Sequence, residues 1–201
     1  MKLDFNLATF VVGILSLCGV MVNIIFTAQN NKKKRYTELI TQRRLNTFQH
    51  IIDCSSSCIK AVYGIITQKL DDNTLLQTFV ENKSQIFYDT NYKAAAEKDL
   101  RNALTKIEDL VVNYIANKET LSKEQKTKLF EVLRRGCDYY QTISCVYCKC
   151  EWVRIKETAL SVKETVDTQQ EYFRRADEIK ADFEENKKVL EENTFDKILK
   201  I

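Results

Sequence analysis

The side chains best suited to chemistry in this chain are seven cysteines and a single histidine. His50, Cys54 and Cys58 follow one another at four-residue intervals, so on a helix they share one face. Cys145 and Cys148 share a face farther along the chain. Thiolates and an imidazole at such spacing on facing helices could hold a zinc ion.

A packing role for these cysteines is the interpretation that we favour over a metal site. Structural zinc sites are usually built on loops or knuckles with turn glycines, whereas these cysteines fall within predicted helices. In a reducing compartment small thiols fill core positions and do not form structural disulfides. We therefore expect no bound metal and no cofactor.

Little in the sequence points to catalysis. Any Cys–His or Ser–His nucleophile pair would depend on His50, which stands mid-helix in an apolar pattern where a structural role is more common. The sequence has no Walker phosphate loop, no Gly-rich dinucleotide turn and no H-E-x-x-H motif. We therefore predict that the protein is not an enzyme.

Pairs of adjacent arginines occur on three different predicted helices. Guanidinium groups bind phosphate in a bidentate manner, so a fold that brought the pairs together would form an anion site for a nucleotide or nucleic-acid signal. The alternative is that they are solvated surface charges, paired with nearby carboxylates. A net charge of +3 is by itself too small to imply nucleic-acid binding. The pairs are Arg43 and Arg44, Arg134 and Arg135, and Arg174 and Arg175.

The elements that would position these residues are predicted to be helices. The chain has no proline and only four glycines, whereas strands need frequent tight turns that draw on both residues. Apolar residues at helical spacing predict helices that pack most simply as an antiparallel, up-down bundle. The expected segments are a first helix ending near Gln68, then Leu75–Phe87, Ala95–Ile115, Ser122–Ile155 and Tyr172–Leu190, with a short turn in the tail.

Local signals mark the ends of several predicted helices. Asn73 or Thr74 is expected to cap the second helix. Ser122 and Gln125 fit a capping box, in which Ser caps the helix and Gln reaches back to it. A turn is expected within residues 159–168, where the apolar periodicity is weak.

The first helix is predicted to cross a membrane. Residues 7–26 carry no charge, and as a helix they span about 30 Å, the thickness of a hydrocarbon core. Lys32, Lys33, Lys34 and Arg35 follow, which places the C-terminal side in the cytosol and the N-terminus outside by the positive-inside rule. The alternative is a cleaved signal peptide, which the long apolar run and weakly basic start disfavour. We expect residues 1–31 to form the membrane segment, among inner or plasma membrane lipids, and 32–201 a cytosolic helical bundle domain.

The polar residues of this span gather on one side of the helix. Lipid offers them no hydrogen-bond partners, so the stripe should face protein or water. Small residues also let helices approach closely. We therefore expect a homo-oligomer, although small and hydroxyl residues are also common in membrane helices with no such role. The face consists of Thr9, Gly13, Ser16, Gly19 and Asn23, flanked by Asn6 and Thr27.

The juncture after the span, Asn30–Phe48, resembles a class of bacterial single-span membrane proteins. There the span leads into a cytosolic helix with the pattern Y-x-x-x-I-x-x-x-R, matched here by Tyr36, Ile40 and Arg44. Many members continue with W-I-x-x-L-R, whereas this chain reads F-Q-H-I at residues 48–51. Such proteins look like membrane effectors of anti-phage defence, in which a sensor or nucleotide signal controls an oligomeric channel. The resemblance implies no catalytic residues.

These observations favour a membrane-anchored, self-associating helical protein. The leading hypothesis is a pore or ion channel lined by Thr9, Ser16 and Asn23 and gated by the cytosolic bundle. The alternatives are a non-conducting tether or scaffold, and an accessory subunit that binds a cytosolic protein through its bundle.

Overall fold

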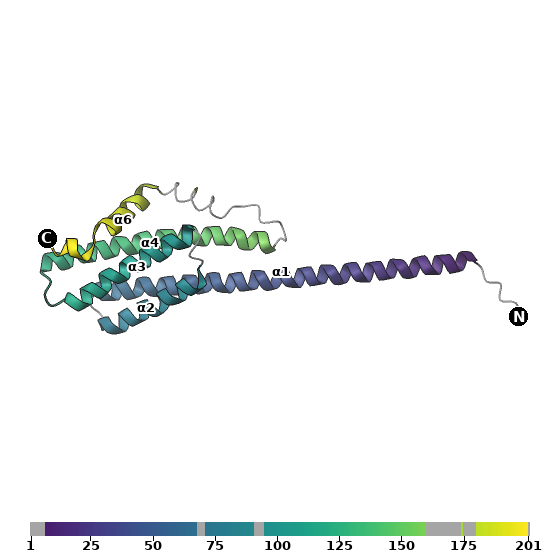
Figure 1. Cartoon of the computed structure of the whole chain (residues 1–201), viewed down its shortest axis with the longest axis horizontal. Helices are drawn as coiled ribbons and strands as arrows, with labels where there is room; N and C mark the ends of the chain where they lie inside the picture. The colour runs from purple at the N-terminus through teal and green to yellow at the C-terminus, as the bar shows by residue number, and fades with distance from the viewer. Residues whose placement is uncertain (1–6, 68–70, 91–94, 160–173, 175–179, 201) are drawn as a thin grey trace. The chain divides into compact units, whose positions relative to one another are not determined.

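Helices make up all the regular structure in the described part of the chain. The computed structural model describes residues 7–67, 71–90, 95–159, 174 and 180–200; the side chains of residues 7–19, 22, 95, 158 and 180–183 lie outside the description. No strand occurs among these residues, so the predicted all-α class is confirmed. The helices are α1 (Leu7–Thr67), α2 (Asp72–Asp89), α3 (Ala95–Asn117), α4 (Lys123–Ala159), α6 (Lys180–Glu192) and α7 (Phe195–Ile198) (Figure 1).

The chain divides into two units, Met1–Arg43 and Arg44–Ile201. Helix α1 contributes residues to both units. Among the described residues, no helix is both long and apolar enough to cross a membrane. Most of the predicted span, residues 7–26, has side chains outside the description, so the span stays a prediction.

The start of α2 differs from the expectation. The N-cap is Asp71, and neither Asn73 nor Thr74 holds that position. The Asp71 carboxylate accepts hydrogen bonds from the Thr74 backbone nitrogen at 2.9 Å and from its hydroxyl at 3.0 Å. These bonds lower the pKa of Asp71. Two aspartates precede Asn73, and the first one accepts a hydrogen bond from one of the free amides of the helix start.

The predicted capping box at the start of α4 is confirmed. The Gln125 backbone nitrogen donates to the Ser122 hydroxyl at 3.1 Å, and the Ser122 backbone nitrogen donates to Gln125 Oε1 at 2.9 Å. The short turn expected in the tail is the helix α7. The turn predicted within residues 159–168, and the helix start near Tyr172, fall on residues outside the description.

The second unit is a helical bundle around one apolar core. Helix α3 packs against α2 and α4, α6 packs against α4 and α3, and α7 contacts α3 and α4 (Figure 1). A Cβ atom at Gly136 would lie 2.9 Å from Leu190 Cδ1 and 3.3 Å from Ile107 Cγ1, so glycine permits this close approach of α4 to α3 and α6. The largest fully buried side chains are Tyr114, Tyr140, Phe79, Ile51, Ile65, Ile86, Leu100, Leu104, Ile107, Leu129 and Leu133.

The C-terminal half of α1 supplies one wall of this core. Its buried apolar residues recur at three- and four-residue steps, the spacing of one helix face: Ile51, Cys54, Cys58, Ala61, Val62 and Ile65. At Gly64 a Cβ atom would lie 2.9 Å from the Leu75 side chain, so α1 and α2 approach closely there. The Cys58 thiol donates to the Phe79 carbonyl of α2 across 3.6 Å.

One buried polar contact joins α1 to α4. The Ser55 and Tyr140 hydroxyl oxygens lie 2.7 Å apart, and Tyr140 is fully buried. Burial raises the pKa of Tyr140, so the phenol keeps its proton. A buried hydroxyl pair is stable only when both partners are in register, so this contact fixes the position of α1 along α4.

We predict that Ser55 and Tyr140 are energetically coupled. Ser55→Ala and Tyr140→Phe should each lower the free energy of unfolding by about 1–3 kcal/mol, because each leaves the other hydroxyl buried without its partner. The double variant should lose less than the sum, by about 0.5 kcal/mol or more, in denaturant titrations. Ser57→Ala is the matched control, since the Ser57 hydroxyl donates only to its own helix, at Asp53 O. Strictly additive losses would contradict the coupling.

Candidate functional site

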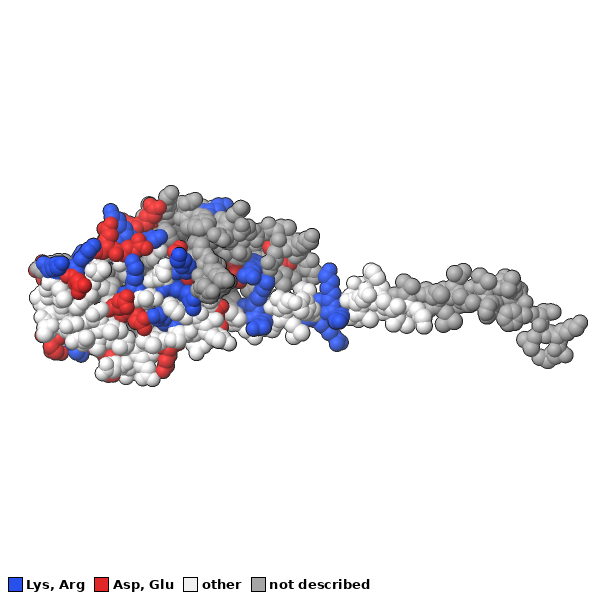
Figure 2. All heavy atoms as spheres, viewed as in Figure 1, with Lys and Arg blue, Asp and Glu red and all other residues white. Residues whose placement is uncertain are grey.

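The described part of the N-terminal unit presents large apolar side chains to its surroundings. Val20, Met21, Ile24, Ile25 and Phe26 are 57–65% exposed. Figure 2 shows this stretch as an uncharged surface followed by a band of basic atoms, which Lys32 to Arg35 supply. Burying one such side chain fully is worth about 1.5–3 kcal/mol, so a run of them is a strong drive toward an apolar partner.

Asn23 is the one member of the predicted polar stripe whose side chain is described. It is exposed, and its amide oxygen accepts a hydrogen bond from the Thr27 hydroxyl at 3.4 Å. This contact runs between successive turns of one helix, so it leaves further hydrogen-bonding capacity on the Asn23 amide. Thr9, Gly13, Ser16 and Gly19 have side chains outside the description.

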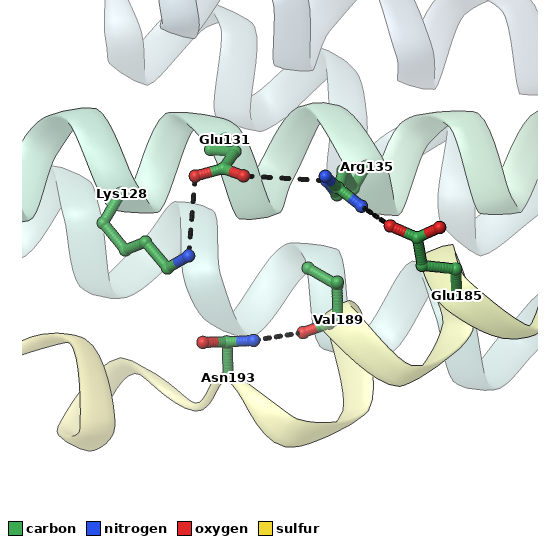
Figure 3. A network of polar contacts seen from close by, with 6 residues as sticks. All are labelled: Lys128, Glu131, Arg135, Glu185, Val189 and Asn193. Carbon is green, nitrogen blue, oxygen red and sulfur yellow. Dashed lines mark hydrogen bonds and ion pairs between the residues drawn. The ribbon is translucent and has the colours of Figure 1, made fainter.

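Arg135 belongs to an ion-pair network between α4 and α6 (Figure 3). Its Nη1 lies 2.6 Å from Glu185 Oε1, and its Nε lies 3.7 Å from Glu131 Oε1. Glu131 also pairs with Lys128 at 3.5 Å. The hydrogen bond to Glu185, with the charges of Glu185 and Glu131, raises the pKa of Arg135. Two carboxylates of the same chain thus pair with Arg135, as expected if it is a surface charge and not part of an anion site.

The other arginines of the predicted anion site lie at separate places along the chain. Arg43 is exposed and Arg44 half-buried on α1, and Arg134 is exposed on α4. Arg174 is exposed, and Arg175 lies outside the described residues. A shared anion site stays a prediction.

The six described cysteines are all free thiols, and most are packed into the bundle. Cys54, Cys58, Cys137 and Cys150 are buried, Cys148 is half-buried, and Cys145 is exposed. Within the described residues, no group of three or more His, Cys, Asp or Glu side chains has the arrangement of a metal site. Burial raises the pKa of Cys58, Cys137 and Cys148 to about 12. These thiols therefore hold their protons at neutral pH.

A contact that the sequence analysis missed joins His50 to the end of α2. The imidazole Nδ1 lies 2.6 Å from Asp89 Oδ2, while Nε2 lies 3.6 Å from the Cys54 sulfur. Spacing in the sequence had linked His50 only to Cys54 and Cys58. Asp89 is 39 residues away, just beyond the second predicted helix, Leu75–Phe87. Nothing in the local sequence distinguishes it as a partner of the histidine.

The C-terminal end of α2 is held in place by further contacts of Thr90, Arg101 and Lys83. The Thr90 amide and hydroxyl both donate to the Ile86 carbonyl, at 3.0 and 2.7 Å. Arg101 of α3 donates to the Phe87 carbonyl at 2.6 Å and lies over the Phe87 ring. Lys83 of α2 also pairs with Glu108 of α3. These contacts position Asp89 against α1.

Comparison of the chain with protein-family models, with curated protein sequences and with solved structures finds no match.

We expect purified protein to carry less than one zinc ion per chain. Zinc binds thiolates, and a metal would have to displace protons from thiols such as Cys148, whose pKa is about 12. Elemental analysis of the metal-exposed, desalted protein measures this. One equivalent of zinc, lost when Cys145 and Cys148 are changed to Ser, would contradict the expectation.

Proposed function

We propose that the protein is anchored in a membrane by residues 7–26 and carries its helical bundle in the cytosol. The observation that carries this proposal is the exposure of five large apolar side chains between Val20 and Phe26. They continue an uncharged sequence that begins at Leu7. Water is an unfavourable surrounding for such a surface, and lipid is a favourable one.

The basic cluster at residues 32–35 supports the orientation. Lys and Arg next to a span are retained on the cytosolic side and are attracted to anionic headgroups. In the described structure these four residues are exposed, as a headgroup contact requires. The bundle follows them in the sequence and would therefore share their side of the membrane.

Self-association is the second part of the proposal. In lipid the Asn23 amide would have no water to bind, and its contact with Thr27 uses only part of its capacity. A polar side chain within a span is stabilised by about 0.6–2 kcal/mol when it bonds to a neighbouring helix. A ring of copies supplies that partner at every Asn23, or else faces it toward water in a lumen.

The finer proposal is that this ring conducts ions under control of the bundle. Thr9, Ser16 and Asn23 would line the pore. Helix α1 continues from that segment to Ser55, which bonds Tyr140 of α4. A change in the bundle would thus reach the ring along one helix, with no chemical step. This is the arrangement of the defence effectors that the juncture resembles.

The test replaces Ser16 and Asn23 together by Leu. Insertion should persist, because the change raises the apolarity of the span. Ion flux from liposomes, and any growth arrest on expression, should fall to the level of empty controls, because two of the three polar side chains proposed to line the pore become apolar. The measurement is dye release or conductance at matched protein density.

Val11→Leu with Cys18→Leu is the matched control. These positions have the same seven-residue spacing on the opposite face, so the pair adds bulk to the span without touching the polar stripe. The control should retain flux. If the Ser16 and Asn23 variant conducts as well as the wild type, the channel proposal fails. A wild type that never conducts leaves a membrane tether as the function.

A further inference from the structure

We propose that Cys54, His50 and Asp89 form a thiol–disulfide exchange site, in which His50 takes the Cys54 proton as the sulfur attacks a neutral or cationic disulfide. His50 and Cys54 lie one turn apart on α1, and Asp89 is the last residue of α2. This inference does not depend on the membrane proposal.

The order of the contacts sets the direction of proton movement. Asp89 Oδ2 lies 2.6 Å from Nδ1, so the carboxylate accepts a hydrogen bond from Nδ1–H, and the unprotonated Nε2 can accept a proton. Nε2 in turn lies 3.6 Å from the Cys54 sulfur, within hydrogen-bond range for a thiol. A nucleophile, a base and a group that orients the base therefore stand in sequence.

The thiol is protonated at rest and needs this base. Burial, followed by the charges of Asp89 and Asp53, raises the pKa of Cys54. The thiolate is the nucleophile in exchange reactions, so an unassisted Cys54 would react slowly. The Cys54 thiol is in hydrogen-bond contact with the imidazole of His50, the only histidine in the chain.

The position of the site in α1 selects disulfide exchange over acyl transfer. Acyl transfer needs backbone N–H groups that stabilise an oxyanion. Residues 50–54 lie in the interior of a long helix, where those groups are already hydrogen-bonded within the helix. Exchange with a disulfide makes no oxyanion and requires only that a proton be moved.

The step balances without any further reagent. The Cys54 sulfur forms a bond to one sulfur of the disulfide, and the original S–S bond breaks with its electron pair on the departing sulfur. The proton passes from Cys54 to His50 Nε2 and then to the departing thiolate. The products are a mixed disulfide at Cys54 and one free thiol, and the disulfide is the oxidant.

The charges around the sulfur define which disulfides react. The charges of Asp89 and Asp53 both raise the pKa of Cys54, and Asp53 accepts a hydrogen bond from Gln49 at 3.0 Å. Two carboxylates repel an anionic disulfide and attract a cationic one. Exchange with cystamine should therefore be faster than exchange with dithiodipropionate.

A mixed disulfide at Cys54 would also change the packing of α1 against α2. Cys54 is 5% exposed, so an attached group has no room between α1 and α2, whereas His50 is 48% exposed and gives the site an open edge. A mixed disulfide must push the end of α2, with Asp89, away from α1. Oxidised surroundings would thus loosen the contact between α1 and α2.

The test measures disulfide exchange in the full-length protein in detergent, with hydroxyethyl disulfide as the probe and peptide mass spectrometry as the readout. His50→Gln should slow exchange at Cys54 at least tenfold, and Asp89→Asn should slow it by a smaller factor, in line with the loss of a general base and of the group that orients it. Cys145, exposed on α4, is the control within each molecule and should keep its rate.

The direction of the change separates a chemical role from a structural one. A substitution that merely loosened the α1–α2 contact would expose Cys54 and speed its exchange. The proposal is overturned if exchange at Cys54 is undetectable in the wild type, or if His50→Gln leaves it unchanged or faster. Equal rates with cystamine and dithiodipropionate would overturn the selection by charge.

Discussion

Burial of one face of α1 between Ile51 and Ile65 is the interaction that joins this helix to the bundle, and the contacts of Ser55 and His50 with other helices depend on it. That face meets α2 at Cys58 and α4 at Ser55, where one buried hydroxyl pair sets the register. Apolar burial supplies the stability, and the polar contact selects a single alignment among those that burial alone allows. The same helix carries exposed apolar side chains earlier in the sequence, so one element has to satisfy two different surroundings.

The contact between His50 and Asp89 lies on the same α1–α2 boundary, next to the Cys54 thiol. The carboxylate is presented by the end of α2, which Thr90 and Arg101 hold in place. A base positioned in this way lies beside a thiol that is otherwise kept protonated by burial. Packing and reactivity are therefore coupled, since anything that modifies Cys54 also disturbs the contact between the helices.

Local patterns predicted the helices well, because apolar spacing and capping are encoded in neighbouring residues. The Ser122 and Gln125 box is an example, and the shift of the α2 cap to Asp71 is an error of two or three positions within one polar cluster. The pairs His50 with Asp89 and Arg135 with Glu185 are separated by 39 and 50 residues. Such contacts depend on how helices pack, which no single-segment pattern records, so neither pair could be predicted from the sequence.

The central claim is that the N-terminal helix anchors the protein in a membrane as an assembly of copies. The mass of the detergent-solubilised particle, corrected for bound detergent, tests it most directly. A membrane-anchored assembly should be extracted only with detergent, and its protein mass should be a whole multiple, two or greater, of the 23.5 kDa chain. A particle of a single chain in mild detergent, or full recovery in detergent-free buffer, would contradict the account.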